Sequence, residues 1–136
     1  MKILFGLFFT LLFLSAGNKI EVKNAWLRPA DAGMNSALYL KIINNSNKAD
    51  TLYKVVFKDA SMAMMHETYK KGDLTGMKMV KEIAINPNST FQFKPGYYHI
   101  MLIKLKKDLK PKEKENFELY FKSGEKIKGI AVVGQI

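Results

Sequence analysis

The sequence predicts an all-β protein with a single domain, built as an antiparallel β-sandwich or barrel. Apolar and polar residues alternate over short segments, which is the pattern of half-buried strands. Turn-forming residues separate these segments about every ten positions, as in sandwiches and barrels. A chain of 136 residues has room for one hydrophobic core. We expect at most a turn or two of helix, around residues 29–35 or 106–109.

The first strands are bounded by clear turn signals. Ile20 and Val22 are expected to point inward from the first strand, with a change of register near Trp26. The second strand ends at the turn signal Asn44-Asn45-Ser46-Asn47. The strands expected in this half of the chain are 19–27, 37–43, 50–57 and 62–69.

The second half repeats this pattern. A loop rich in glycine is expected at 72–76, and Asn86-Pro87-Asn88 and Pro95-Gly96 mark two further turns. The last two strands form a hairpin across Ser123-Gly124. The strands expected here are 77–85, 89–93, 98–105, 116–122 and 126–133.

The N-terminus has the composition of a secretory signal peptide. Lys2 precedes an apolar run over residues 3–14, and the small residues Ser15-Ala16-Gly17 follow. The run is shorter than the roughly 20 residues of a membrane span, so an uncleaved anchor is the less favoured alternative. We therefore expect residues 1–17 to be a signal peptide, cleaved after Gly17 or Ala16. The domain then spans 18–136, and the protein is periplasmic without stable membrane insertion.

The sequence contains no cysteine. No disulfide can therefore stabilise the fold, and no N-terminal cysteine is present to carry a lipid. A blue-copper electron-transfer site and thiol–disulfide exchange are excluded, because both require thiol groups. Stability must come from the hydrophobic core, for which 48% apolar residues is sufficient.

The formal charge of +10 comes almost entirely from lysine, and Arg28 is the single arginine. Surfaces that bind nucleic acid usually combine arginine and aromatic residues on one face, so we expect no nucleic-acid partner. Lysines at alternate strand positions more often form a solvated face and protect sheet edges. The alternative is a positive surface that steers the protein toward acidic partners or anionic lipid.

Both histidines of the chain lie in a regular spacing with two methionines. The pattern is His66-x10-Met77-x21-His99-x-Met101. Imidazole nitrogen is a common metal ligand and thioether sulfur is a soft one, so this set favours Cu(I). Zinc is disfavoured because its sites use Cys, His and carboxylate ligands.

Strand geometry supports part of this ligand set and leaves part open. His99 and Met101 alternate on one face, with Ile100 directed to the core, and a hairpin can bring His66 beside Met77. Met77 and Met79 share a face, so geometry does not choose between them. Met64 shares a face with His66 and is either core or a neighbouring sulfur. The methionines expected in the core are Met34, Met62 and Met65.

The spacing and its flanking residues resemble the periplasmic copper chaperone family PCuAC. The resemblance runs from Val22 to Ala131 and includes these residues: Trp26, Arg28, Ala37, Tyr39, Asn44, Asn45, Gly76-Met77-Lys78-Met79 and Gly96-Tyr97-Tyr98-His99-Ile100-Met101-Leu102. It implies a cupredoxin-like Greek-key sandwich, with His66, Met77, His99 and Met101 as Cu(I) ligands and Met79 and Met64 as neighbours. It also implies delivery of copper to the CuA centre of cytochrome c oxidase or to an Sco-like thiol protein. Trp26 and Arg28 are expected to be structural, as a core aromatic and an ion pair.

The neutral ligands are typical of a carrier. Two imidazoles and two thioethers leave a Cu(I) site with charge +1 and bind more weakly than thiolates. We expect no enzyme, because no further histidine is available as an acid or base. The expected protein is a monomeric copper chaperone. The alternatives are copper sequestration or uptake without an oxidase partner, and a secreted β-sandwich that binds no metal.

Overall fold

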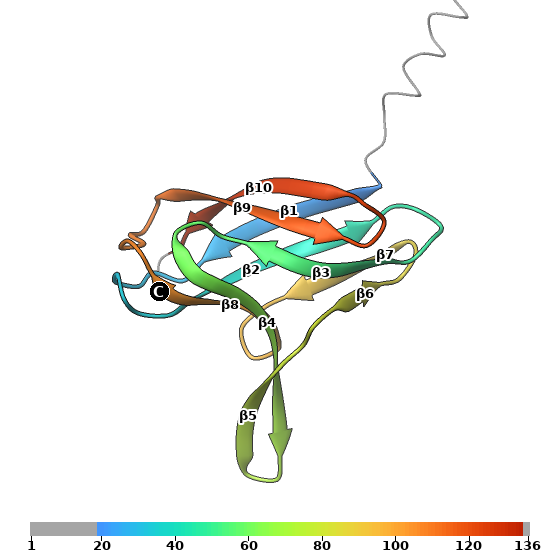
Figure 1. Ribbon diagram of the computed structural model, residues 1–136. Helices are drawn as coiled ribbons and strands as arrows, with labels where there is room; N and C mark the ends of the chain where they lie inside the picture. The colour runs from blue at the N-terminus through green and yellow to red at the C-terminus, as the bar shows by residue number, and fades with distance from the viewer. Residues whose placement is uncertain (1–18, 135–136) are drawn as a thin grey trace, which may run out of the picture.

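The computed structural model describes residues 19–134, which form ten β-strands (Figure 1). The predicted signal peptide lies outside the described residues. Residues 19–134 contain no helix that could cross a membrane. The strands are β1 (Ile20–Leu27), β2 (Ser36–Asn44), β3 (Asp50–Val56), β4 (Ala60–Lys71), β5 (Leu74–Met79), β6 (Ile83–Ile85), β7 (Ser89–Phe93), β8 (Tyr98–Leu105), β9 (Lys114–Phe121) and β10 (Lys126–Val133).

The strands form one hydrogen-bonded path that folds over the core. Their order is β5-β4-β8-β2-β1-β10-β9-β3-β6, and β7 also pairs with β2. All pairs are antiparallel except β1 with β10, which is parallel. The predicted all-β class is confirmed, with this one parallel pair as the departure from a purely antiparallel arrangement. Figure 1 shows the β4–β5 hairpin projecting from the body of the domain.

The core is apolar and draws on nearly every strand. Burial of one such side chain contributes about 1.5–3 kcal/mol relative to exposure, which provides stability without disulfides. The largest side chains that are fully buried are Phe93, Phe117, Phe121, Ile20, Leu27, Leu38, Leu40, Ile42, Leu52, Ile85, Ile100 and Leu102.

The single strand predicted at 77–85 is wrong, because the chain forms two strands there. β5 pairs with β4, and this contact ends where the Val80 N–H donates to the Met65 carbonyl at 2.8 Å. β6 pairs instead with β3, at the other end of the strand order. The loop predicted at 72–76 is also shorter than expected. The turn is Gly72-Asp73, with φ of +64° at Gly72, and Gly76 already lies in β5.

A bulge interrupts β1 where the sequence predicts a change of register. The pairing with β2 shifts between Lys23 and Trp26, and Asn24 has a positive φ of 56°. Asparagine tolerates this conformation better than most residues. The predicted register change near Trp26 is therefore confirmed.

The two segments where the sequence allowed at most a helical turn pair with each other. The N–H of Ala30 donates to the carbonyl of Leu109 at 3.2 Å, and the N–H of Leu109 donates to the carbonyl of Ala30 at 2.8 Å. These backbone groups are satisfied between two loops rather than along a helix. Neither segment forms the turn or two of helix that was the most the sequence allowed there.

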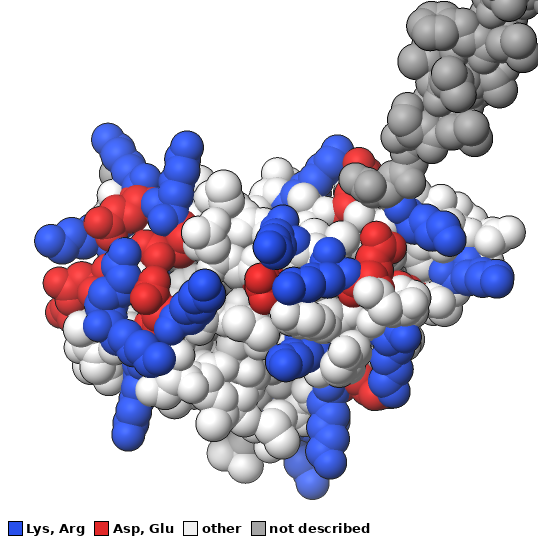
Figure 2. All heavy atoms as spheres, turned by 45° about the horizontal axis from the view of Figure 1, so that its top comes forward, with Lys and Arg blue, Asp and Glu red and all other residues white. Residues whose placement is uncertain are grey.

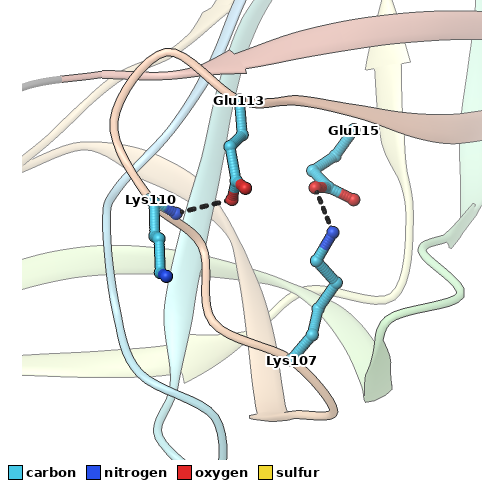
Figure 3. Close-up of polar contacts among 4 residues, drawn as sticks. All are labelled: Lys107, Lys110, Glu113 and Glu115. Atoms are coloured by element: carbon cyan, nitrogen blue, oxygen red, sulfur yellow. Dashed lines mark hydrogen bonds and ion pairs between the residues drawn. The ribbon is translucent and has the colours of Figure 1, made fainter.

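A buried carboxylate fixes the connection between β8 and β9 (Figure 3). Glu115 is 7% exposed and accepts a hydrogen bond at 2.8 Å from the Lys107 ammonium group. This bond and the charge of Glu115 raise the pKa of Lys107. In the same connection, the backbone N–H of Lys110 donates to Glu113 at 2.9 Å. Paired in this way, the Glu115 charge can remain inside the fold.

Figure 2 shows lysines spread over one face of the molecule, with acidic residues among them. The ammonium groups of Lys54 and Lys126 lie 5.1 and 5.3 Å from the Tyr120 ring centroid. Lys126 also lies 3.7 Å from Glu118. The mixture of lysines and acidic residues in Figure 2 fits the predicted solvated lysine surface.

Candidate metal centre

His66 and His99 are directly opposite each other on β4 and β8. Their ring centroids are 5.6 Å apart and the rings are nearly perpendicular, at 83°. Met64 and Met101 form a further pair of this register, two residues along each strand. Because paired residues of an antiparallel sheet project from the same face, β4 and β8 bring all four side chains to one face.

A break between β7 and β8 places His99 beside β4. Both strands run along the same edge of β2, where Leu40 pairs with Phe93 and Leu38 pairs with Ile100. Between these two pairs, β2 contributes one residue, Tyr39, whereas the neighbouring segment contributes residues 94–99. Residues 94–99 therefore loop away from the edge of β2. The excursion turns at Pro95-Gly96, where φ of Gly96 is +79° and the Tyr97 N–H donates to the Lys94 carbonyl at 3.1 Å.

Met77, His99 and Met101 line one cleft of about 260 Å³. Its walls come from β2, β4, β5 and β8 and from the segments next to them. Arg28 is the one charged residue among those that line it. The other lining residues are Asn35, Ser36, Ala37, Tyr39, Thr68 and Gly96.

Met79 lies in a different cleft from Met77. The pairing of β4 with β5 places Met77 opposite Thr68 and Met79 opposite His66. Met79 and Met64 line a second cleft, which does not include His99 or Met101. Sequence geometry left these two methionines equivalent, whereas the folded chain places only Met77 in the cleft with His99 and Met101.

The histidine nitrogens have different environments. Nδ1 of His99 lies 3.3 Å from the carbonyl oxygen of Tyr97. In the neutral form of His99 that donates its Nδ1 hydrogen to this carbonyl, Nε2 carries no hydrogen. Its lone pair is then free to bind a metal ion. Nδ1 of His66 is buried and has no hydrogen-bond partner. Such an unsatisfied buried nitrogen is uncommon in folded proteins and is available to a ligand.

The folded state favours the neutral form of His66. Burial lowers its pKa below 6.5, and the neighbouring His99 lowers it further by charge repulsion. Neutral imidazole is the form that binds a metal ion.

Of the three methionines predicted to be core residues, one is buried in the structure and two are exposed. Met65 is 5% exposed, which confirms the prediction. Met34 and Met62 are 60% and 53% exposed, so their assignment to the core is wrong. Met34 lies in the loop between β1 and β2, and Met62 lies on the outer face of β4 with Met64.

Arg28 and Trp26 differ from their predicted roles. The guanidinium of Arg28 donates to the Tyr39 hydroxyl at 3.1 Å, and no ion pair found in residues 19–134 includes it. The predicted ion pair is therefore wrong. Trp26 is only partly buried and packs on Tyr39, with ring centroids 4.7 Å apart. Both residues belong to the family resemblance and were expected to be structural; of the two, Arg28 lines the cleft and Trp26 does not.

The sequence profile of the family described as "Putative lipoprotein LpqE-like" matches residues 20–133, which is nearly the whole described domain. The chain belongs to the LpqE-like family. "Putative lipoprotein Lxx21020" of Leifsonia xyli subsp. xyli is 30% identical to this LpqE-like chain over 106 residues. The alignment covers 77% of the chain and 63% of that relative, so the chain spans less than two thirds of its length.

Solved PCuAC domains have the same fold as this LpqE-like chain. The copper-bound PCuAC domain of PmoF2 is 23% identical, with a TM-score of 0.72 over 89% of this chain and 97% of that domain. Apo-DR1885 of Deinococcus radiodurans is 25% identical, with a TM-score of 0.67 over 90% and 83% of the two chains. A Cu(I) form of DR1885 matches at the same TM-score and identity. The predicted cupredoxin-like β-fold is confirmed.

The donor atoms of the site fit a soft metal better than a hard one. Residues 19–134 contain no group of three or more His, Cys, Asp or Glu side chains that could hold a metal ion. A four-ligand site built on His66 and His99 therefore requires thioether sulfur. The thioethers of Met77 and Met101 lie in the cleft that also contains His99, whereas His66 is not among the residues that line it.

Proposed function

We propose that this LpqE-like chain is an exported carrier of Cu(I), bound by His66, Met77, His99 and Met101. The observation that supports this most directly is the shared cleft of Met77, His99 and Met101, with His66 opposite His99. The copper-bound PmoF2 domain and Cu(I)-DR1885 support copper as the cargo, since both have this fold. Met79 and Met64 are neighbouring sulfurs in this proposal.

The chemistry of the donors favours a carrier over an enzyme. Four neutral donors stabilise Cu(I) without an anionic ligand that would favour Cu(II). Thioethers bind the ion more weakly than thiolates, so copper can pass to an acceptor that offers cysteine. Met77 is 55% exposed, which leaves one donor at the surface where an acceptor can approach.

The proposed acceptor is the CuA centre of cytochrome c oxidase or an Sco-like thiol protein. Export to the periplasm agrees with the signal peptide predicted at residues 1–17 and with the lipoprotein names of the family and its relative. Sequestration of copper would use the same site without a partner of this kind.

A transfer experiment tests this proposal. The domain is loaded with Cu(I) under anaerobic conditions and mixed with a soluble CuA domain or an Sco-like protein, and copper in each protein is measured after separation. Delivery predicts that copper moves to the acceptor, and that a His99→Ala chain cannot be loaded. Met62→Leu is the matched control, because Met62 lies on the same face outside the site. Copper that stays on the carrier with every acceptor would contradict delivery and favour sequestration.

A further inference from the structure

We infer that Arg28 makes the cleft selective for an anionic thiolate as the group that receives the copper. This inference rests on the proposed Cu(I) site. Arg28 was predicted to be structural, yet its side chain lines the cleft with Met77, His99 and Met101.

Arg28 is held in place without being neutralised. Its Nη2 donates to the Tyr39 hydroxyl at 3.1 Å, and its Cζ lies 5.9 Å from the centroid of the Tyr39 ring. Tyr39 is itself fixed, being 4% exposed and packed against Trp26. No acidic side chain lines the cleft, and no carboxylate of the described domain forms an ion pair with Arg28. A positioned guanidinium with free donors is a binding group for an anion.

The charge of Arg28 does not assist the metal itself. A Cu(I) ion with four neutral ligands carries +1, and a nearby guanidinium repels it. The positive charge becomes favourable when an anion joins the ion in the cleft. An arginine here therefore favours the complex of carrier, copper and incoming anion over the carrier with copper alone.

The cleft has room for this third component. A water molecule takes up about 30 Å³ in the liquid, so a cleft of about 260 Å³ is several times larger than a single ion requires. Among anionic ligands, a soft thiolate is preferred by Cu(I) over a carboxylate. The group admitted beside Arg28 is therefore the thiolate of a cysteine side chain or of a small thiol.

The exchange is a ligand substitution without electron transfer. The thiol loses its proton to solvent, and its sulfur forms a bond to Cu(I). The bond from copper to the exposed Met77 sulfur breaks in return. Copper remains Cu(I), and the ion with its new ligand becomes neutral overall.

The test compares thiolate with neutral acceptors at equal concentration. Cu(I)-loaded wild type and Arg28→Gln are mixed at pH 8.5 with N-acetylcysteine methyl ester, with the peptide acetyl-Cys-Gly-Gly-Gly-Cys-amide, or with the neutral chelator neocuproine. We expect Arg28→Gln to slow copper loss to the thiolates by about three- to tenfold and to leave loss to neocuproine unchanged. An effect on both thiol probes identifies thiolate in general, and an effect on the peptide alone identifies a protein side chain.

Two further variants separate local recognition from other effects. Lys94→Gln removes one positive charge near Tyr97 but outside the cleft, and we expect it to change none of the rates. Tyr39→Phe removes the hydroxyl that holds Arg28, and we expect a smaller slowing with the same selectivity. Equal rates for wild type and Arg28→Gln with both thiol probes would overturn the inference, as would equal slowing by Lys94→Gln.

Cu(I) dissociation constants and melting temperatures are measured first for each variant. We expect Arg28→Gln to bind Cu(I) as tightly as wild type or more tightly, because a repelling charge is removed. Wild type that binds no Cu(I) would contradict the proposed function itself. Normal Cu(I) binding without a thiolate-selective effect would contradict only the role of Arg28.

Discussion

His66 and His99 face each other across β4 and β8 with nearly perpendicular rings and centroids 5.6 Å apart. Two imidazoles held this close by a strand register are positioned before any ligand arrives. Preorganisation of this kind reduces the entropy lost on binding. The first prediction follows from this pair.

Removal of either histidine should weaken Cu(I) binding strongly. Loss of a group that only supports a metal ligand typically lowers affinity by roughly 10–100-fold, and we expect loss of a ligand itself to lower it by more. His66→Ala and His99→Ala are compared with Met62→Leu in anaerobic titrations against a Cu(I) chelator. We expect Met62→Leu to bind as wild type does. Because His99 is 6% exposed, its variant is first checked for folding by circular dichroism. A folded His99→Ala chain with wild-type affinity would remove His99 from the site.

The choice between Met77 and Met79 gives the second prediction. We expect Met77→Leu and Met101→Leu to weaken Cu(I) binding, and Met79→Leu to change it little, because Met79 lines the other cleft. Leucine keeps a similar volume, so packing is preserved. X-ray absorption of each Cu(I) form counts the sulfur ligands. Two sulfurs retained in Met77→Leu but only one in Met79→Leu would reverse the assignment.

The lowered pKa of His66 predicts how stability depends on pH in the copper-free protein. The unfolded chain binds a proton at His66 near pH 6.5, whereas the folded chain binds it only at lower pH. Between these two values the unfolded state holds more protons, so stability falls as pH decreases through this window. Urea unfolding at pH 7.5 and pH 5.5 should show a smaller loss in His66→Gln than in wild type. Equal losses in both chains would contradict the shift.

Acid should also release copper, since protons compete with the metal for imidazole nitrogen. Because the pKa of His66 is lowered, protons compete with the metal for this side chain only below pH 6.5. We expect the Cu(I) affinity of wild type to decrease from pH 7.5 to pH 5. A flat affinity over this range would exclude both histidines as ligands.

The ion pair between Lys107 and Glu115 predicts an asymmetry in stability. Glu115 is buried, whereas the Lys107 side chain is 44% exposed. Lys107→Met leaves a buried carboxylate without its partner, whereas Glu115→Gln leaves an exposed ammonium group that water can solvate. We expect Lys107→Met to lower the melting temperature more than Glu115→Gln does. The reverse order would show that Glu115 is satisfied by other groups.

Several strands were predictable from sequence because alternation and turn residues are local signals. β7, β8 and β10 have the predicted bounds, and the shared face of His99 and Met101 follows from alternation alone. The split between β5 and β6 was not predictable, because it depends on β5 pairing with β4 while β6 pairs with β3. The local sequence of a strand does not determine which distant strand it pairs with.

Exposure of the methionines and the place of Arg28 were not predictable for a related reason. Met62 was expected in the core because a methionine in a strand is usually core filler. In the fold, β4 lies near the end of the strand order, and the face that carries Met62 is open to solvent. Arg28 reaches the cleft through a hydrogen bond to Tyr39, which is 11 residues away. The family resemblance chose Met77 over Met79 as a candidate ligand, whereas strand geometry left both open. The fold places Met77 in the cleft with His99 and Met101, and it places Met79 opposite His66.

The most direct test of the account is an anaerobic titration of the purified domain with Cu(I) in the presence of a competing chelator, repeated with Zn(II). The account predicts one Cu(I) per chain with high affinity and weak Zn(II) binding, because two of the four donors are thioethers and none is a thiolate. No uptake of Cu(I), or zinc bound as tightly as copper, would contradict it.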